Sequence, residues 1–185
     1  IKIISCLVDI TNYINFDLCR PLHVFDADKI QGDIVIRHSK KGEKFLGLDD
    51  QEYILDDNMI VICDENKIIS LAGILGGKSS CCDRETKNIL IESAYFLPDS
   101  ISSTGRKLNI QSDARYRFER GIDPESTENG INLASRMITK LCGGDLCEII
   151  KDNSSIKKDK SIEISSNFIN QILGTNLNDK LIQEK

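Results

Sequence analysis

The stretch MIVICDENKIISLAGIL, residues 59–75, decides the fold of this chain. An apolar run at 59–63 is followed by the polar segment 64–67 and then by a second apolar run at 68–75. Two β-branched, apolar segments joined by a short polar connection predict an antiparallel hairpin. We therefore expect the first half of the chain to form an antiparallel sheet.

Further short strands are predicted on both sides of this hairpin. A second hairpin is expected with its polar turn at 49–51, because apolar residues stand on both sides of that turn. Continuous β-branched runs indicate single strands before and after the two hairpins. The segments expected to be strands are 34–38, 45–48, 53–55 and 88–96.

Helices are predicted at both ends of this β-rich region. Residues 9–19 carry Ile10 and Ile14 at four-residue spacing, which predicts a short amphipathic helix that ends before Pro21. A second helix is expected over 100–108.

A third helix and a final strand complete this part of the prediction. Pro124 suits the first turn of a helix, and Gly143-Gly144 suits its end. A strand over 146–150 would follow. Strands grouped before helices predict an α+β fold with a mainly antiparallel sheet and flanking helices.

The chain divides into two parts at a polar segment. Residues 151–160 are charged and poor in apolar side chains, so we expect a linker between a domain at 1–150 and a second domain beginning at 161–185. The second part is predicted to be a small α/β segment, with a strand at 161–164, a helix that Ser166 caps, and a helix that Asn178 caps. Because the chain starts at Ile1, we interpret it as an internal piece of a longer protein.

Composition excludes several classes of protein. The 185 residues are 40% hydrophobic and 29% charged, which is ordinary for a globular protein and excludes a disordered or collagen-like chain. The longest apolar runs are a few residues, too short to span a bilayer, so we expect no membrane association. With 24 basic and 29 acidic residues the net charge is -5, so any RNA contact must come from a local basic patch.

One such patch is predicted at residues 104–120. Five basic residues and two acidic residues there give a local net charge of +3. The candidates for contacts with tRNA phosphates are Arg106, Lys107 and Arg115. Alternatively, Arg117 and Arg120 form structural ion pairs with Glu119 or Asp123.

The cysteine pattern does not predict a metal site. There are seven cysteines with no CxxC spacing and only two histidines, His23 and His38, so a zinc site is not supported. Adjacent Cys81 and Cys82 could form a vicinal disulfide, but reduced thiols are the expected state in a cytosolic protein.

Five sequence blocks stand out in order along the chain. They are VDITNY at 8–13, PLHVFD at 21–26, AGILGG at 72–77, IESA at 91–94 and SDARYRFERGIDP at 112–124. Together they resemble the editing region of the bacterial phenylalanine–tRNA ligase β subunit, over residues 4–150. Ala72, Lys78 and Ser112 depart from the family pattern, so the local loop geometry is expected to differ.

The resemblance implies an activity and its context. The family is an α2β2 aminoacyl-tRNA synthetase of protein biosynthesis, which uses ATP and magnesium to join phenylalanine to its tRNA in the cytoplasm. The region resembled here hydrolyses tyrosine misattached to that tRNA, with no metal or cofactor of its own. An editing site is needed because an apolar pocket rejects an added hydroxyl by only about 10²-fold.

The resemblance also implies roles for individual residues. Glu92 would accept the tyrosine hydroxyl, and His23 would orient the attacking water or hold the terminal adenosine. From the residues alone, a surface glutamate and a structural histidine are the simpler interpretations. The residues that match pocket-lining positions of the family are Thr11, Asn12, Gly76, Gly77, Ser112, Asp113 and Ala114.

No nucleophile motif accompanies these residues. We therefore expect direct attack of water on the ester, oriented by pocket side chains and backbone N–H groups. If His23 acts as a neutral imidazole, hydrolysis should fall as the pH drops through about 6.5. Two alternatives stay open: a module that only docks tRNA or a subunit, and a free-standing deacylase.

Overall fold

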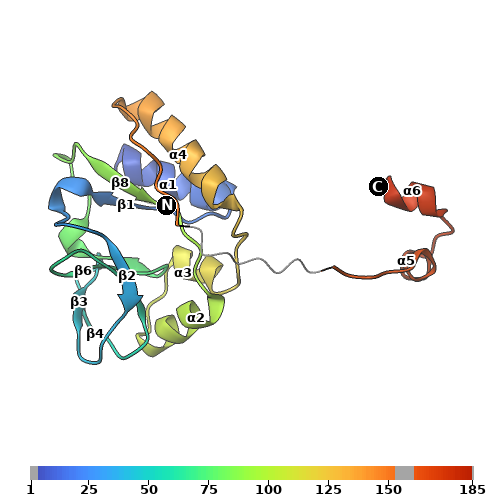
Figure 1. Ribbon diagram of the computed structural model, residues 1–185, viewed down its shortest axis with the longest axis horizontal. Coiled ribbons are helices and arrows are strands. Elements are labelled where there is room, and N and C mark those ends of the chain that lie inside the picture. The colour runs from blue at the N-terminus through green and yellow to red at the C-terminus, as the bar shows by residue number, and fades with distance from the viewer. Residues whose placement is uncertain (1–3, 153–160, 185) are drawn as a thin grey trace. The chain divides into compact units, whose positions relative to one another are not determined.

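The hairpin predicted at residues 59–75 lies at the centre of a four-stranded antiparallel sheet. Its strands β5 (Ile60–Cys63) and β6 (Ile68–Leu71) pair with each other. β2 (Val35–His38) pairs with β5, and β7 (Leu75–Gly76) pairs with β6, so the strand order is β2-β5-β6-β7. Figure 1 labels β2 and β6 of this sheet.

The expected single strand over 68–75 is wrong, because the chain reverses direction between β6 and β7. Gly73 has a φ of +67°, a left-handed conformation that glycine adopts without a steric penalty. A Cβ at this position would also lie 2.7 Å from the ring of Phe96. The reversal brings Gly76 beside Ser70.

The second hairpin is confirmed. β3 (Lys44–Leu46) and β4 (Glu52–Ile54) pair in antiparallel register across a polar turn. This hairpin joins β7, because the backbone N–H of Leu48 donates to the carbonyl of Gly76 at 3.0 Å.

A separate two-stranded ribbon joins segments far apart in the sequence. β1 (His23–Asp26) pairs with β8 (Ile89–Glu92) in antiparallel register. β8 is shorter than the strand predicted over 88–96. We call this pair the β1–β8 ribbon.

Four helices complete the described part of the first unit. The helices at 98–107 and 126–142 lie close to the predicted positions. Ser5, whose hydroxyl accepts a hydrogen bond from Val8, starts the first helix earlier than predicted. The third helix was not predicted, and Ser112 caps it. The helices are α1 (Cys6–Asp17), α2 (Pro98–Lys107), α3 (Asp113–Phe118) and α4 (Ser126–Cys142), with short 3-10 turns η1 (Ala27–Lys29) and η2 (Lys78–Ser80).

The predicted strand at 146–150 is absent, and these residues are exposed without regular structure. Apolar residues there suggested a strand, but Gly143 and Gly144, both at positive φ, lead the chain away after α4. No neighbouring strand then offers hydrogen bonds to this segment.

Two hydrophobic clusters enclose the β1–β8 ribbon. The larger cluster includes Phe25 of β1 together with residues of the four-stranded sheet and of α2. The smaller cluster contains buried residues of α1 and α4, with Ile89 and Ile91 of β8 packed against it. Because side chains alternate along a strand, α1 and α4 cover one face of the ribbon and the larger core covers the other.

A buried arginine connects three segments of the first unit. The Arg20 side chain is fully buried. Its guanidinium donates to the Ala94 carbonyl at 2.8 Å, to the Asp123 carbonyl and to the Ser126 hydroxyl. Burial lowers the pKa of Arg20, and the nearby Asp123 opposes this shift. Arg20 therefore joins the end of α1 to the segments that follow β8 and precede α4.

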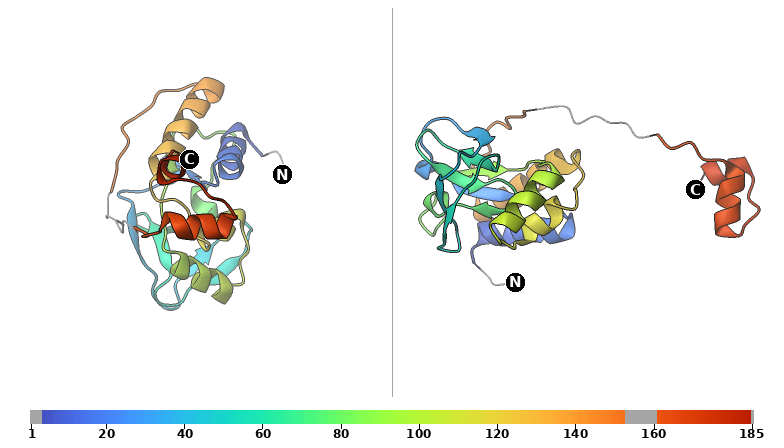
Figure 2. Two further views of the ribbon diagram at one scale, coloured as in Figure 1. Left: turned by 90° about the vertical axis from the view of Figure 1, so that its right-hand side faces the viewer. Right: turned by 90° about the horizontal axis from the view of Figure 1, so that it is seen from below.

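The structure is a computed structural model that describes residues 4–152 and 161–184. It divides into two units, Ile1–Ile149 and Ile150–Lys185. The segment 153–160, most of the predicted linker, lies outside the described residues. The second unit, red in Figure 2, contains α5 (Ser166–Leu173) and α6 (Asp179–Gln183).

The second unit departs from the prediction in two details. Residues 161–164 form no strand, since this segment has no strand partner among the described residues. Ser165, not Ser166, caps α5 by accepting a hydrogen bond from Phe168. Gly174 ends α5 in the left-handed conformation, and Asn178 caps α6, as predicted.

The α+β class with a mainly antiparallel sheet and flanking helices is confirmed. No helix among the described residues is both long and apolar enough to cross a bilayer. Within those residues, no group of three or more His, Cys, Asp or Glu side chains is placed to hold a metal ion. Cys81 and Cys82 are free thiols.

Replacing Arg20 with alanine should destabilise the first unit. Arg20→Ala removes a fully buried side chain and leaves the Ala94 carbonyl without this donor, while the Asp123 carbonyl keeps its hydrogen bonds from Ser126. The free energy of unfolding should therefore fall by about 2–4 kcal/mol. Urea denaturation measures this. Arg136→Ala, at an exposed position of α4, is the matched control and should change stability by less than about 0.5 kcal/mol. Equal effects of the two substitutions would contradict the structural role of Arg20.

Candidate functional site

His23 and Glu92 lie directly opposite each other on the β1–β8 ribbon. The register pairs His23 with Glu92 at one end of the ribbon. Directly opposed residues in an antiparallel pair point to the same face, with Cβ atoms about 4.5–5.5 Å apart. Phe25, two residues after His23, belongs to the larger core, so this face is the one away from α1 and α4. The fold thus brings together the two residues expected to carry the chemistry.

The His23 imidazole is packed tightly and lacks a hydrogen-bond partner at one nitrogen. Its ring meets Phe25 edge to face, with ring centroids 4.5 Å apart. Nε2 is buried and has no hydrogen-bond partner among the described residues. Burial lowers the pKa of His23 to about 4. At neutral pH the imidazole is therefore uncharged and keeps one nitrogen available for a further hydrogen bond.

Glu92 is a desolvated carboxyl group without a compensating partner. Burial raises its pKa to about 7. No hydrogen bond or ion pair joins its carboxyl group to another described residue. A carboxyl group in this state titrates at physiological pH, which is typical of functional sites.

Because of these pKa shifts, Glu92 rather than His23 is the residue expected to titrate near neutral pH. With a pKa near 4, His23 stays neutral over the range in which we expected it to titrate, so the predicted acidic limb near pH 6.5 is wrong for His23. Glu92 titrates near pH 7 instead. Both shifts have the same cause, which is burial of the charged form.

Gly76 makes the close packing of His23 possible. A Cβ at Gly76 would lie 2.4 Å from Cε1 and 2.7 Å from Nε2 of His23. Any larger residue would therefore displace the imidazole. Gly77 has a different environment, since a Cβ there would lie 2.5 Å from the Ile69 carbonyl oxygen within the sheet. Of the two predicted glycines, Gly76 contacts His23 and Gly77 packs against β6.

The block at 112–114 forms the start of α3. The Ser112 hydroxyl accepts a hydrogen bond from Arg115 and donates one to the Ile74 carbonyl at 2.6 Å. This bond fixes α3 to the turn that leads into Gly76. Asp113 is exposed in the first turn, and Ala114 packs partly buried against the larger core.

Thr11 and Asn12 lie on α1, which covers the other face of the ribbon. Thr11 is buried and its hydroxyl donates to the Val8 carbonyl at 2.8 Å. Asn12 is half-buried. Neither contacts His23 or Glu92 through a hydrogen bond, so their place in the same pocket stays a prediction.

The basic patch is partly neutralised within the fold. Arg115 is only 12% exposed, pairs with Glu119 at 3.0 Å and donates to the Ile110 carbonyl. Lys107 pairs with Asp56. Arg106 is exposed, with no ion pair to a described residue, and is thus the freest of the three candidates.

The ion-pair alternative for the other two arginines is confirmed in part. Arg120 pairs with Glu119 at 2.9 Å, as that alternative predicts. Arg117 lies 3.8 Å from Asp113 rather than pairing with Glu119 or Asp123.

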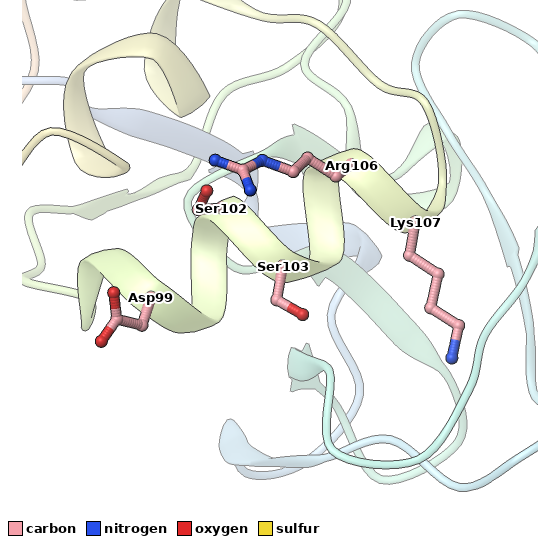
Figure 3. Close-up of a pocket in the computed structure, with 5 residues that line it drawn as sticks. All are labelled: Asp99, Ser102, Ser103, Arg106 and Lys107. Carbon is pink, nitrogen blue, oxygen red and sulfur yellow. The ribbon is translucent and has the colours of Figure 1, made fainter.

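An open hollow of about 530 Å³ lies along α2. Figure 3 shows its lining residues, and none of them comes from β1, β7 or β8. Both acidic and basic side chains line it, so it does not form a purely basic surface. The residues are Asp99, Ser102, Ser103, Arg106 and Lys107.

Comparison with known proteins identifies the family of this chain. The model of the B3/4 domain family matches residues 1–143. The chain belongs to the B3/4 domain family. Similar curated proteins are phenylalanine–tRNA ligase β subunits: the one from Paramagnetospirillum magneticum is 46% identical over 180 residues, which is 97% of this chain and 23% of that protein. The one from Brucella abortus (strain 2308) is 54% identical over 141 residues, 76% of this chain and 18% of that protein.

A solved structure shares the fold of this B3/4 domain chain. It is an N-terminal fragment of the phenylalanyl-tRNA synthetase β subunit from Pyrococcus horikoshii, with a TM-score of 0.52 and 17% identity. The match covers 96% of this chain and 53% of that structure. The chain thus spans about a quarter or less of the two curated relatives described above.

Two neighbours of His23 were not predicted from the sequence. Phe25 could have been found, because it is two residues from His23 and so shares its face of a strand. Leu48 could not have been found from the sequence. A Cβ at Gly76 would lie 2.9 Å from the Leu48 side chain, but Leu48 reaches this position only because the β3–β4 hairpin packs against β7.

The raised pKa of Glu92 predicts a pH-dependent cost to stability. The folded protein binds this proton more tightly than the unfolded chain, so the contribution of Glu92 to stability should fall as the pH rises from 4.5 to 7. Glu92→Gln removes this titration. Its stability relative to wild type should therefore rise by about 1–3 kcal/mol from pH 4.5 to pH 8.

Urea denaturation at several pH values measures this difference. Comparing variant with wild type cancels the opposite contribution of His23, whose lowered pKa makes stability fall as the pH drops from 6.5 to 4. A stability difference that is constant with pH would show that Glu92 is not desolvated in the folded protein.

Proposed function

We propose that this B3/4 domain is the editing module of a phenylalanine–tRNA ligase β subunit. It would hydrolyse tyrosine misattached to the phenylalanine tRNA, by direct attack of water on the ester. The observation that carries the proposal is the His23–Glu92 pair, two desolvated and unpartnered groups opposed on one face of the β1–β8 ribbon. The similar proteins are phenylalanine–tRNA ligase β subunits, which supports the same family context.

Glu92 would distinguish tyrosine from phenylalanine. As a carboxylate it accepts a hydrogen bond from the phenol hydroxyl, and a bond to a charged group contributes about 1.5–3 kcal/mol. This corresponds to a roughly 10- to 150-fold preference for tyrosine. The absence of any donor to this carboxyl group among the described residues leaves its acceptor capacity for the substrate.

His23 would hold the water or the terminal adenosine. A neutral imidazole offers one acceptor nitrogen and one donor nitrogen. Nε2 is buried and has no partner among the described residues, and a hydrogen bond with a water molecule or a ribose hydroxyl would satisfy it. Close packing of the ring on Gly76 and Phe25 fixes its orientation, which is what a positioning group requires.

The wider context is also part of the proposal. The intact enzyme would be a cytoplasmic α2β2 heterotetramer that aminoacylates its tRNA with ATP and magnesium. Those cofactors would bind outside this chain, and the editing reaction would need none. Arg106 is the best placed of the three basic candidates to contact tRNA phosphates, because Lys107 and Arg115 already have acidic partners.

The two alternative functions, a docking module and a free-standing deacylase, account for less of the site's geometry. A module that only docks tRNA gains nothing from two half-buried, unpaired titratable groups, whose desolvation destabilises the fold. A free-standing deacylase fits less well with relatives about four times longer than the matched region. We therefore prefer editing in cis.

Replacing Glu92 should impair editing selectively. Glu92→Ala should lower the rate of tyrosyl-tRNA hydrolysis by about 10- to 150-fold, because one charge-assisted hydrogen bond is lost. Phenylalanine attachment by the intact enzyme should be unchanged. Single-turnover deacylation measures the first effect, and Glu85→Ala, at an exposed position, is the control. Wild-type hydrolysis by Glu92→Ala would exclude Glu92 from the site.

The two histidines should behave differently. His23→Ala removes the unpartnered nitrogen and should lower tyrosyl-tRNA hydrolysis by at least about 10-fold. His38→Ala, at an exposed end of β2, should leave the rate unchanged. Thermal melting of both variants separates a functional effect from unfolding. A folded His23→Ala protein with the wild-type rate would remove His23 from the mechanism.

A further inference from the structure

Two cysteines lie at the end of the interface between α1 and α4. These helices pack side by side, as Figure 1 shows, and their buried residues follow four-residue steps. One step before Ile10 is Cys6, the first residue of α1, and one step after Ile138 is Cys142, the last residue of α4. The buried residues of this stripe are Ile10, Ile14, Ala134 and Ile138.

The two thiols contact each other. Burial raises the pKa of the Cys142 thiol, and a side-chain hydrogen bond with Cys6 raises it further. This contact joins the start of α1 to the end of α4, so the two helices run antiparallel. Cys6 and Cys142 therefore form the last pair of residues along the helix interface.

Both thiols are accessible, and the backbone beside them has room to adjust. Cys6 and Cys142 are free and exposed. Gly143 and Gly144 follow Cys142 at positive φ, with no heavy atom within 4 Å of the position of an added Cβ. The end of α4 can thus adopt the Cα separation of about 4.4–6.8 Å that a disulfide needs.

The other cysteines lack this arrangement. Cys63 is buried in the larger core, and Cys81 and Cys82 are half-buried. Burial raises the pKa of the Cys82 thiol to about 11. Cys19 and Cys147 are exposed, but neither contacts another thiol among the described residues.

We propose that Cys6 and Cys142 form a reversible disulfide when the protein meets a peroxide. One thiol loses its proton and the thiolate attacks a peroxide oxygen: an S–O bond forms, the O–O bond breaks, and the departing hydroxide takes up that proton and leaves as water. The second thiolate attacks the resulting sulfenic sulfur, forming the S–S bond and releasing a second water. Two thiols are oxidised by two electrons, and one peroxide is reduced to two waters. A dithiol reductant reverses the reaction.

The disulfide would join α1 covalently to α4 behind the β1–β8 ribbon. The closed loop would contain every strand of the first unit, since Cys6 precedes β1 and Cys142 follows β8. A cross-link over so long a loop restricts the unfolded chain strongly. Oxidation should therefore raise the melting temperature of the full chain, by about 5 °C or more.

Peptide mapping of the oxidised full chain tests the proposal. The protein is treated with a small excess of hydrogen peroxide, alkylated and digested without reduction. We expect a peptide that links Cys6 to Cys142 as the main disulfide product, removed by dithiothreitol. Cys147→Ser, at an exposed position near Cys142, is the matched control and should give the same linked peptide and the same rise in melting temperature.

The variants of the pair complete the test. Cys6→Ser and Cys142→Ser should give no linked peptide and no rise in melting temperature after oxidation. The proposal is overturned if wild-type protein yields only separately oxidised Cys6 and Cys142. It is equally overturned if either thiol pairs mainly with Cys19 or Cys147.

Discussion

The pairing of β1 with β8 is the constraint on which the rest of the structure depends. These strands are distant in sequence, yet their register alone places His23 opposite Glu92. A shift of β8 by one residue would turn Glu92 toward α1 and α4 and leave His23 on the opposite face. Apolar residues on both faces oppose such a shift, because Phe25 belongs to one core while Ile89 and Ile91 pack against the other.

The second physical feature of the site is that His23 and Glu92 are desolvated without a partner among the described residues. Both members of the pair lose hydration, and neither gains an ion pair in exchange. Desolvation moves the pKa of His23 down to about 4 and that of Glu92 up to about 7. Such an arrangement reduces stability, and folded proteins retain it mainly where function requires it. Gly76 contributes by allowing the imidazole to pack against the backbone.

Local patterns in the sequence predicted much of the fold. The polar turns at 49–51 and 64–67 predicted both hairpins, and Asn178 and Gly174 marked helix ends correctly. The expected strands at 146–150 and 161–164 were wrong, because an apolar run forms a strand only where a partner supplies hydrogen bonds. α3 was missed because its six residues carry too little periodicity to distinguish a helix.

The candidate site was predictable in its residues but not in its geometry. The sequence blocks contained His23 and Glu92, yet nothing local indicates that they are cross-strand neighbours. The buried Arg20 was also unforeseen, since its hydrogen-bond partners come from segments that only the folded chain brings together. The direction of the His23 pKa shift depends on burial, which no local pattern determines.

The pH dependence of substrate preference tests whether Glu92 recognises the tyrosine hydroxyl. Single-turnover deacylation of tyrosyl- and phenylalanyl-tRNA would be measured on the intact enzyme from pH 5.5 to 8.5. If the Glu92 carboxylate accepts a hydrogen bond from the phenol hydroxyl, the rate for tyrosyl-tRNA divided by the rate for phenylalanyl-tRNA should rise as the pH increases through about 7. This rise should be absent in Glu92→Gln. Equal rates for both substrates at every pH would contradict the account.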